Sequence, residues 1–416
     1  MKVLQINQSD VLGSRFQNFA IRNLLTREGI ESRHLVWNPL SNDPTVGKIF
    51  NFPLVRSMNR QIAVCERSLS IHSVLQLQSM LLPLQSWFRE ADVVHYHIVH
   101  DGYFSILAMP LLSRLKPSIW TWHDPWIMTG HCIYPMQCQR WQTGCGLCPN
   151  LELPFQMKVD RTALAFRQKL WTMRHSKVDV IVASAHMLEM AQRSPIGREV
   201  RLHKIPFGID LGRFCPADAA PARKRLGVLD GRVVILVRAF DSPFKGFDYF
   251  VQALDRLDTT IPLCILTTHD KGRLNRFIGK HQIVELGWVN DDEVILDSYR
   301  AADILVMPST AEAFGMMAIE AMACGKPVIV SDGTSLPEVT VAPDVGISVP
   351  AYDPAALAVE IKRLVEDSEE RQRRGIAGRK IAEQRYDAVL FTSRLAEIYR
   401  RVATPTKGNT EIAYSP

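Results

Sequence analysis

The sequence predicts an α/β protein with two doubly wound domains, each built on a parallel β-sheet. At 416 residues the chain is too long for one ordinary hydrophobic core, so two domains are expected. Short apolar segments alternate with helical segments in two series, a pattern typical of repeated βα units. A passage rich in proline and glycine, residues 204–216, separates the two series.

The first series occupies the amino-terminal half of the chain. Its expected strands are short and apolar, as buried parallel strands usually are. They span residues 3–6, 34–37, 92–97, 118–122 and 179–184. A loop that contains Gly13 follows the first strand, and a helical run is expected from Arg15 to Arg27.

The second series has the same character and leads into a charged carboxyl-terminal region. Its expected strands span residues 233–237, 262–267, 282–287, 303–308 and 327–330. Beyond Asp353 the chain is expected to be helical. We therefore expect residues 1–206 to form the first domain and residues 207–385 the second, with a disordered tail at residues 403–416.

The composition is that of an ordinary soluble globular protein, with 47% hydrophobic and 22% charged residues. The net charge of +6 suits anionic small substrates or an acidic membrane surface, but it is too small for a nucleic-acid-binding footprint. No secretory signal is expected, because Met1 and Lys2 lead directly into the first strand, and no apolar stretch is long enough to span a membrane. These features predict a cytoplasmic protein, in which eight cysteines do not indicate a disulfide framework.

Residues 308–338 carry the strongest functional signal. A loop with Glu312 follows an expected buried strand and enters a short helix that begins at Gly315 and contains Glu320. Open α/β sheets bind ligands at loops of this kind, which leave the carboxyl end of a parallel strand. The N–H groups at the helix start suit a phosphate, and a carboxylate suits sugar hydroxyls. The alternative is a solvated helix face with two chance glutamates.

The run PSxxExFGxxxxEAMAxGxPVI closely resembles the donor-site signature of the retaining glycosyltransferases of family four. That family has the GT-B architecture, so the resemblance implies two Rossmann-like domains that face a cleft. It also implies that a last helix, at about residues 386–402, crosses back onto the first domain.

The same resemblance implies roles for the residues of the signature. Glu320 would bind the nucleotide ribose, and Glu312 would orient the hydroxyls of the donor sugar. Backbone N–H groups that would contact the phosphate and the sugar belong to Phe314, Gly315 and Met316. Glu338, on the next loop, is a second-tier candidate.

Two cations near the strand at residues 233–237 are further donor-site candidates. Arg238 ends the strand, and Lys245 precedes Gly246 at the start of a helix. They resemble the family's Gly-Arg…Lys-Gly pattern, which neutralises the leaving nucleoside diphosphate. The sequence departs from this pattern, since Val237 stands where the family has glycine and the Arg–Lys spacing is stretched. As an isolated pair, the two cations would be solvated surface charges.

The first domain offers candidates for the reacting sugar and the acceptor. Gly13 lies where a glycine lets the backbone approach a phosphate or an acceptor closely. His123 matches the family's histidine that faces the reacting sugar, with Asp124 beside it; the alternative is a core histidine with satisfied hydrogen bonds. Further acceptor-side candidates end the preceding strand and are His97, His100 and Asp101.

The loop at residues 130–150 contains Cys132, Cys138, Cys145 and Cys148. The last two have the C-x2-C spacing of a zinc knuckle, whereas the other spacings are irregular. Structural zinc, reduced buried thiols and a redox disulfide are all open alternatives, and a closed four-cysteine site would have no catalytic position. The loop resembles one that follows the His-Asp pair in glycosyltransferases of bacterial capsule, exopolysaccharide and lipopolysaccharide biosynthesis.

We therefore expect a hexosyltransferase that retains the anomeric configuration and uses a nucleoside-diphosphate sugar. Its acceptor would be a sugar hydroxyl of a growing, lipid-linked surface polysaccharide. No cofactor is expected for catalysis, since the sequence has no Asp-x-Asp metal motif. The alternatives are a sugar-nucleotide epimerase, another non-transferring enzyme of this fold, or a nucleotide- or glycan-binding protein without turnover.

Residues 46–90 mix apolar and basic side chains. The segment either rests on anionic lipid headgroups at the inner face of the cytoplasmic membrane or packs on the first sheet as an ordinary amphipathic helix. The residues concerned are Lys48, Phe50, Phe52, Leu54, Arg56, Met58, Arg60 and Arg67.

Overall fold

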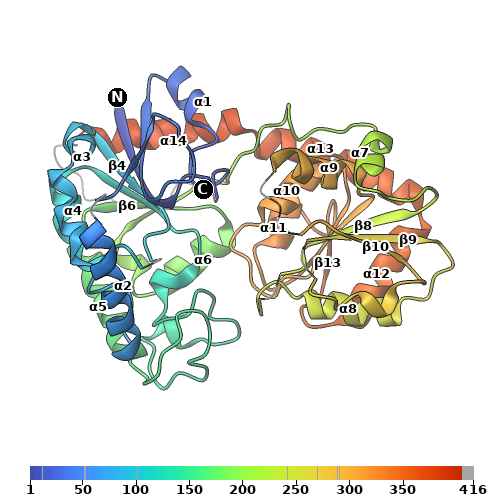
Figure 1. Ribbon diagram of the computed structural model, residues 1–416, viewed down its shortest axis with the longest axis horizontal. Coiled ribbons are helices and arrows are strands. Elements are labelled where there is room, and N and C mark those ends of the chain that lie inside the picture. Colours follow the sequence, from blue (N-terminus) through green and yellow to red (C-terminus); the bar gives the residue numbers. More distant parts are fainter. Residues whose placement is uncertain are drawn as a thin grey trace. The chain divides into compact units, whose positions relative to one another are not determined.

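The computed structural model divides the chain into two compact units (Figure 1). Unit 1 comprises Met1–Pro206 and Val389–Pro416, and unit 2 comprises Phe207–Ala388. The structure describes residues 1–11, 13–50, 53–100, 102–240, 242–268, 270–287, 289 and 291–404. The disordered tail was expected at residues 403–416, but residue 403 still belongs to a helix, and residues 405–416 lie outside the described residues, as do Phe52 and Asp101.

Unit 1 is built on a seven-stranded sheet in which every pairing is parallel. The strand order is β3-β2-β1-β4-β5-β6-β7. The strands are β1 (Lys2–Ser9), β2 (Glu31–Asn38), β3 (Val46–Lys48), β4 (Val93–Tyr96), β5 (Ser118–Thr121), β6 (Val178–Val182) and β7 (Arg201–Lys204). The short strands β3 and β7 were not predicted, because they are only partly buried and lack an apolar run.

The α-helices of unit 1 are α1 (Arg22–Arg27), α2 (Pro53–Ser68), α3 (Ser86–Glu90), α4 (Met109–Leu115), α5 (Thr162–His175), α6 (Ala185–Arg193) and α14 (Ala388–Ala403). Five 3-10 segments join them: η1 (Leu77–Leu84), η2 (Ile106–Ala108), η3 (Pro125–Met128), η4 (Arg140–Gln142) and η5 (Gly197–Glu199). In Figure 1, α14 (red) runs beside the amino-terminal strands (blue), and Tyr399 of α14 accepts a hydrogen bond from Gln5 of β1. The last helix thus belongs to unit 1 although it follows unit 2 in the chain.

The predicted helix from Arg15 to Arg27 is wrong in its first half. Residues 13–20 form turns, and α1 begins only at Arg22. Asn18 has a left-handed backbone conformation (φ 66°), which a helix does not accommodate. Its side chain donates to Gln5 and to Tyr399, so tertiary contacts override the local helical preference.

Unit 2 is built on a six-stranded parallel sheet of order β10-β9-β8-β11-β12-β13. The strands are β8 (Val233–Val237), β9 (Leu263–Thr267), β10 (Gln282–Glu285), β11 (Ile304–Met307), β12 (Val328–Ser331) and β13 (Ile347–Val349). The helical elements are α7 (Ala219–Arg225), α8 (Phe247–Arg256), η6 (Asn275–Phe277), α9 (Asp292–Ala301), α10 (Met316–Ala323), α11 (Leu336–Thr340), α12 (Pro354–Glu366) and α13 (Ser368–Arg385).

Helices cover both faces of this second sheet (Figure 1). On one face α8 and α12 pack together over β8, β9 and β11 and bury a core that includes Phe250, Leu254, Ile361 and Leu364. On the other face α7 packs on α9 and α10 on α13. The structure therefore has the two Rossmann-like domains that the sequence predicts.

Candidate functional site

The donor-site candidates of unit 2 lie where the neighbouring strands β8 and β11 end. Arg238 directly follows β8, and Lys245 precedes the start of α8. Glu312 lies in the loop after β11, and Gly315 is the N-terminal cap of α10. Because β8 and β11 are adjacent and parallel, both loops leave the same edge of the sheet.

Hydrogen bonds between Thr310 and the carbonyls of Pro243 and Phe244 join these two loops, and we call this contact the clasp. The N–H of Thr310 donates to the carbonyl of Phe244 at 2.9 Å, and its hydroxyl donates to the carbonyl of Pro243 at 2.9 Å. Gly246 has a left-handed conformation (φ +63°), and a Cβ atom there would lie 1.8 Å from the carbonyl oxygen of Pro308. The approach of the two loops therefore requires a glycine at this position.

The clasp brings Lys245 and Glu312 into direct contact. The ammonium of Lys245 donates to the carboxylate of Glu312 at 2.7 Å, and their side chains are 24% and 13% exposed. The backbone of Glu312 is held from a third loop, since Ser335 donates its N–H and its hydroxyl to the Glu312 carbonyl at 3.2 and 3.0 Å. The structure thus places one cation and one carboxylate side by side on three connected loops.

The start of α10 leaves its first N–H groups without a side-chain cap. Gly315 has φ +98°, and a Cβ atom there would lie 2.3 Å from Leu336, so the sharp entry into the helix depends on glycine. The Phe314 side chain is buried against Phe207 and Tyr386 and anchors this turn. Phe314, Gly315 and Met316 therefore offer backbone N–H groups where the helix dipole favours an anion.

Glu320 lies deeper than the other donor-site candidates. Its side chain is fully buried in α10, and the hydroxyl of Tyr299 donates to its carboxylate at 2.6 Å. A buried carboxylate needs such a partner, because burial without hydrogen bonds is costly. Tyr299 comes from α9, and no local sequence pattern indicated that it would reach Glu320.

Arg238 and Glu338 are more exposed. The guanidinium of Arg238 lies 5.3 Å from the ring centroid of Phe240, and Glu338 lies on the exposed side of α11. The structure keeps Arg238 at the same sheet edge as Lys245, on the opposite end of one loop. The ribose role of Glu320 and the diphosphate role of Arg238 stay predictions.

Unit 1 has a separate pocket at the carboxyl ends of β4 and β5. It is lined by His97, His100, Trp120, Thr121, Trp122, His123, Asp124, Trp126 and Ile127. His123 and Asp124 follow β5, as the sequence predicts, and His97 follows β4. The pocket is thus rich in imidazole and indole groups.

Hydrogen bonds determine which nitrogen of His123 carries its proton. The amide nitrogen of Gln5 donates to Ser32 and Tyr399, so its oxygen accepts from Nε2 of His97 at 2.9 Å. Neutral His97 then accepts at Nδ1 from Nε2 of His123, at 3.0 Å. The network therefore assigns the Nε2–H tautomer to His123, with Nδ1 as its acceptor nitrogen.

Burial keeps these imidazoles neutral. It lowers the pKa of His123 to about 3, and it holds the pKa values of His95 and His97 well below the ordinary value of 6.5. Burial alone would raise the pKa of Asp124, but His100, which lies 3.3 Å away, and the Trp126 N–H hold it below its usual value. The pocket therefore presents neutral His97 and His123 beside the ionised carboxylate of Asp124.

Gly13 lies in the turns after β1. It has φ +78°, and its carbonyl accepts from the N–H groups of Phe16 and Gln17, both at 3.0 Å. The ring of Phe16 in turn lies 5.1 Å from that of His123. The structure thus brings the Gly13 turn close to the histidine pocket.

Sequence reasoning missed the residues that support this pocket from within the sheet. Gln5 and His95 lie on adjacent strands, and Tyr399 joins them from α14. The available signal was a polar residue within a strand: Gln5 lies in β1 and His95 in β4, and both side chains are buried. A buried polar residue in such a strand indicates a hydrogen-bond network.

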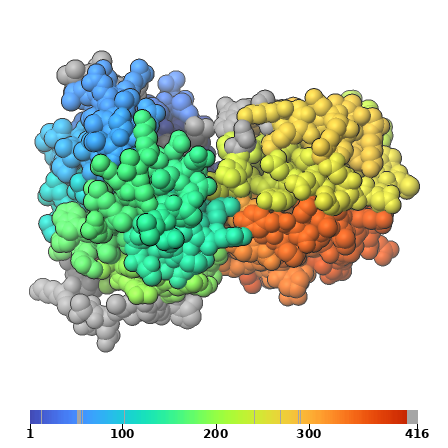
Figure 2. Space-filling view, turned by 90° about the horizontal axis from the view of Figure 1, so that it is seen from below, coloured from blue at the N-terminus to red at the C-terminus, as the bar shows by residue number. Residues whose placement is uncertain are grey.

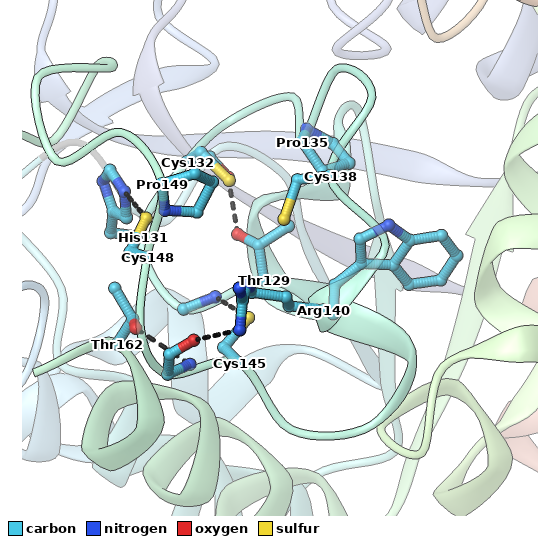
Figure 3. Close-up of a pocket in the computed structure, with 13 residues that line it drawn as sticks. Thr129, His131, Cys132, Pro135, Cys138, Arg140, Cys145, Cys148, Pro149 and Thr162 are labelled. Carbon is cyan, nitrogen blue, oxygen red and sulfur yellow. Dashed lines mark hydrogen bonds between the residues drawn. The ribbon is translucent and has the colours of Figure 1, made fainter.

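The four loop cysteines line one further pocket of unit 1, together with His131, Arg140 and Trp141 (Figure 3). All four are free thiols. Burial raises the pKa of Cys132 to about 11 and that of Cys145 to about 12. As the side chains stand, the described residues include no group of three His, Cys, Asp or Glu side chains arranged to hold a metal ion.

The segment with mixed apolar and basic character contains β3, α2, η1 and α3. Helix α2 exposes Met58, Arg60 and Arg67, while Asn59 and Glu66 are buried. The side chains of Leu54 and Arg56 lie outside the described residues. Within the described part of the chain, every helix is too short or too polar to cross a lipid bilayer.

Part of unit 2 matches a known protein family. Residues 219–381 match the family described as glycosyl transferases group 1. A putative colanic acid biosynthesis glycosyl transferase, WcaC, of Escherichia coli K12 is 27% identical over 260 residues, which are 59% of this chain and 61% of WcaC. A D-inositol 3-phosphate glycosyltransferase of Geodermatophilus obscurus is 32% identical over 307 residues, 65% of this chain and 60% of the relative. The matches thus span about three fifths of these relatives.

Solved structures of the same fold cover nearly the whole chain. Sucrose-phosphate synthase from Thermosynechococcus elongatus superposes with a TM-score of 0.68 at 18% identity, covering 97% of this chain and 99% of that one. Anabaena HepE in complex with UDP-glucose has a TM-score of 0.66 at 17% identity, with coverage of 96% and 100%. The protein therefore has the two-domain GT-B fold, and residues 219–381 match the glycosyl transferases group 1 family.

Proposed function

We propose that the protein transfers a hexosyl group from a nucleoside-diphosphate sugar to a sugar hydroxyl, with retention of anomeric configuration. The observation that carries this proposal is the Lys245–Glu312 ion pair beside the uncapped start of α10. A cation and bare helix N–H groups suit a diphosphate, and a carboxylate at 13% exposure suits the hydroxyls of the attached sugar. All of these groups belong to the matched family domain.

In this proposal Lys245 and Arg238 neutralise the charge that develops on the leaving diphosphate. Electrostatic stabilisation of this kind is usually the largest contribution to such a reaction. When a diphosphate binds, Lys245 interacts with this second anion and its contact with Glu312 weakens. The carboxylate of Glu312 is then free to turn toward the sugar. The carboxylate of Glu320 accepts hydrogen bonds from the ribose in addition to the one that the Tyr299 hydroxyl donates.

His123 acts on the side of the reacting sugar. Its Nδ1 accepts a hydrogen bond from a sugar hydroxyl, because its Nε2–H is committed to His97. Since burial keeps His123 neutral, it orients the sugar without attracting a second anion into the pocket. A same-face reaction, in which the diphosphate accepts the proton of the acceptor hydroxyl, needs no covalent nucleophile.

We further propose that the acceptor belongs to a lipid-linked bacterial surface polysaccharide. The support is similarity to proteins whose names carry that role: WcaC is named for colanic acid biosynthesis. The structure of WaaG, described as a glycosyltransferase involved in lipopolysaccharide biosynthesis, superposes with a TM-score of 0.63 at 14% identity. The structural likeness supports the fold, and the acceptor class rests on the similarity to WcaC.

A lipid-linked acceptor agrees with the exposed apolar side chains of unit 1. Several large hydrophobic residues on neighbouring elements are exposed, and they are Met58, Val64, Leu77, Leu81, Leu84, Leu111 and Leu115. The basic residues Arg60 and Arg67 are exposed on α2. Apolar side chains flanked by cations suit peripheral contact with anionic lipid at the inner face of a membrane.

Vesicle flotation tests this contact. We expect the protein to float with anionic vesicles and the double variant Arg60→Gln, Arg67→Gln to float less. The matched control is Arg201→Gln, an exposed arginine on β7 of the same unit. Equal flotation of the wild type and the double variant would contradict membrane contact through α2.

The decisive experiment for the transferase is thermal stabilisation by UDP, GDP, ADP, CMP and NAD, followed by turnover of the matching sugar donor. UDP is the first probe, because HepE was crystallised with UDP and UDP-glucose. We expect one diphosphate to raise the unfolding temperature of the wild type and of the control Lys362→Met, an exposed lysine on α12. Lys245→Met should lose the shift.

Anomeric configuration is then read from the product by NMR. No shift with any diphosphate, or an equal shift in Lys245→Met, would contradict the donor site. Binding without transfer to any glycan acceptor would instead favour a nucleotide-binding protein, and conversion of the donor without an acceptor would favour an epimerase.

A further inference from the structure

The loop between η3 and α5 is long and has little internal support. Residues 129–161 contain one short regular element, η4. Its buried residues are few and are Thr129, Gly130, His131, Pro135, Trp141 and Met157. Much of this loop lies at the surface of unit 1, among the blue-green atoms of Figure 2. Loops of this length without secondary structure are uncommon in compact domains, and those that occur often have a function.

Four thiols surround one pocket inside this loop (Figure 3). Cys132 and Cys138 come from its first part, and Cys145 and Cys148 come from the turn after η4. That turn is strained, since Cys145 and Leu147 both have left-handed conformations (φ 57° and 49°). Strain of this kind persists where surrounding contacts impose it, often at ligand-binding turns.

Polar groups contact two of the sulfurs that line the pocket. The N–H of Gly130 donates to the sulfur of Cys145 at 3.2 Å, and His131 contacts the sulfur of Cys148 at 3.4 Å. Backbone and imidazole groups in the second sphere of a metal site orient its ligands in this way.

A buried lysine lies against the same loop. Lys169 of α5 is 2% exposed and donates to the carbonyls of Trp126 and Thr129 at 2.6 and 3.0 Å. The groups that interact electrostatically with its charge are Cys132, Cys145 and Asp124. Asp124 already pairs with His100. Lys169 therefore lies near enough for thiolates at Cys132 and Cys145 to interact with its ammonium group.

We propose that Cys132, Cys138, Cys145 and Cys148 bind one zinc ion that cross-links this loop. Each thiol releases its proton to solvent as its sulfur binds the metal, and the four sulfurs close to about 2.3 Å from the ion. This closure requires rotation of the cysteine side chains, since the described side chains do not converge on one point as they stand. Zinc with four thiolates carries a net charge of −2, which Lys169 partly compensates.

The zinc ion would also support the histidine pocket. The loop continues directly from His123 and Asp124 through η3, and Lys169 holds the carbonyls at both ends of this short segment. Fixing the loop therefore fixes one wall of the pocket that contains Trp126 and Ile127. The role is structural, because four protein ligands leave the ion no position for substrate.

The first test is metal content by mass spectrometry of the full chain, purified without chelator under reducing conditions. We expect about one zinc per chain in the wild type and in Cys65→Ser, which changes an exposed cysteine on α2 outside the loop. Cys145→Ser, Cys148→Ser and their combination should each lose most of the metal. Cobalt substitution should give the charge-transfer absorption of thiolate-bound metal in the wild type and Cys65→Ser alone.

The second test is independent of folding of the variants. Adding a strong chelator to the wild type should lower its unfolding temperature by about 5 °C or more and expose residues 129–161 to protease, and added zinc should reverse both effects. Wild type that contains no zinc, with free thiols or with two loop disulfides by intact mass, would overturn the proposal. So would metal that remains in the double cysteine variant.

Discussion

The two units hold their candidate residues at equivalent places, the carboxyl ends of central parallel strands, but with opposite electrostatic character. Unit 2 places ionised side chains there, with Lys245 against Glu312 and Arg238 exposed nearby. Unit 1 places buried imidazoles there, and burial keeps His97 and His123 neutral. The same fold therefore builds one edge that suits a charged diphosphate and another that suits neutral hydroxyl groups.

The difference comes from how each edge is supported. In unit 2 the candidates stand on loops joined by backbone contacts, where solvent reaches the charges. In unit 1 the candidates follow strands β4 and β5. They lie beside a layer of buried polar side chains made by Gln5, Asn18 and Tyr399. Side chains therefore stay charged on the solvent-accessible loops of unit 2, whereas burial in unit 1 favours their uncharged forms.

The largest expected effect is a loss of stability of unit 1 in acid, because acid protonates the buried histidines of that unit. Burial lowers the pKa of His34, His72 and His123 to about 3, so below the ordinary value of 6.5 the unfolded state binds more protons than the folded state. Stability is then complete above pH 6.5 and falls as the pH decreases toward 3. Each such histidine costs about 1.4 kcal/mol per pH unit in this window.

Unit 2 should resist acid longer. Its described residues include one buried histidine with a lowered pKa, His281, and the pKa of Glu370 is lowered to about 2 by Arg373 and its other arginine partners, against a smaller burial effect. The contribution of Glu370 is lost only below its ordinary value of 4.5. Hydrogen exchange at pH 5 should therefore show loss of protection in unit 1 first. Simultaneous loss in both units would contradict this order.

The next effect tests the clasp between the loops of unit 2. Gly246→Ala places a methyl group against the Pro308 carbonyl and should cost about 3 kcal/mol of unfolding free energy, through overpacking and backbone strain. Gly231→Ala is the matched control, because Gly231 has φ +70° with no atom within 4 Å of its Cβ position. Denaturant unfolding measures both. Equal losses would assign the whole effect to backbone conformation.

A third prediction separates the two members of the ion pair. Glu312→Gln should lower kcat by about 100-fold, because the sugar loses a charged acceptor, while the affinity for the nucleoside diphosphate is kept or increased as Lys245 is released. Lys245→Met should instead weaken the diphosphate. Titration calorimetry and initial rates measure the two quantities. The same loss of diphosphate affinity in both variants would show that the pair acts as one structural unit.

The smallest effect concerns His97 as a positioning residue for His123. His97→Leu removes the acceptor for Nε2–H of His123 and should lower kcat by about tenfold without changing diphosphate affinity. His97→Asn should restore part of the rate, because its oxygen can accept that proton. The control is His203→Gln, a histidine of unit 1 that contacts Asp179. Equal rates in the leucine and asparagine variants would exclude the tautomer argument.

Several features could be predicted because they depend on neighbours in the chain. The strand of residues 303–308 and the glycine before α10 are local signals, and the Glu-x7-Glu run indicated where to look for the carboxylates. The helix expected from Arg15 failed for the opposite reason. Asn18 takes part in a contact with Tyr399, which lies 381 positions away, and no window of sequence contains both residues.

By itself the sequence determined the alternation of strands and helices, the glycines at positive φ and the chemistry available at each strand end, because these depend on local sterics and residue type. Tertiary structure alone decided that Lys245 meets Glu312, that Tyr299 reaches Glu320 and that His97 orients His123. Those contacts depend on the order in which parallel strands assemble. Strand order is set by the burial of whole helices and sheets, a property that no single segment carries.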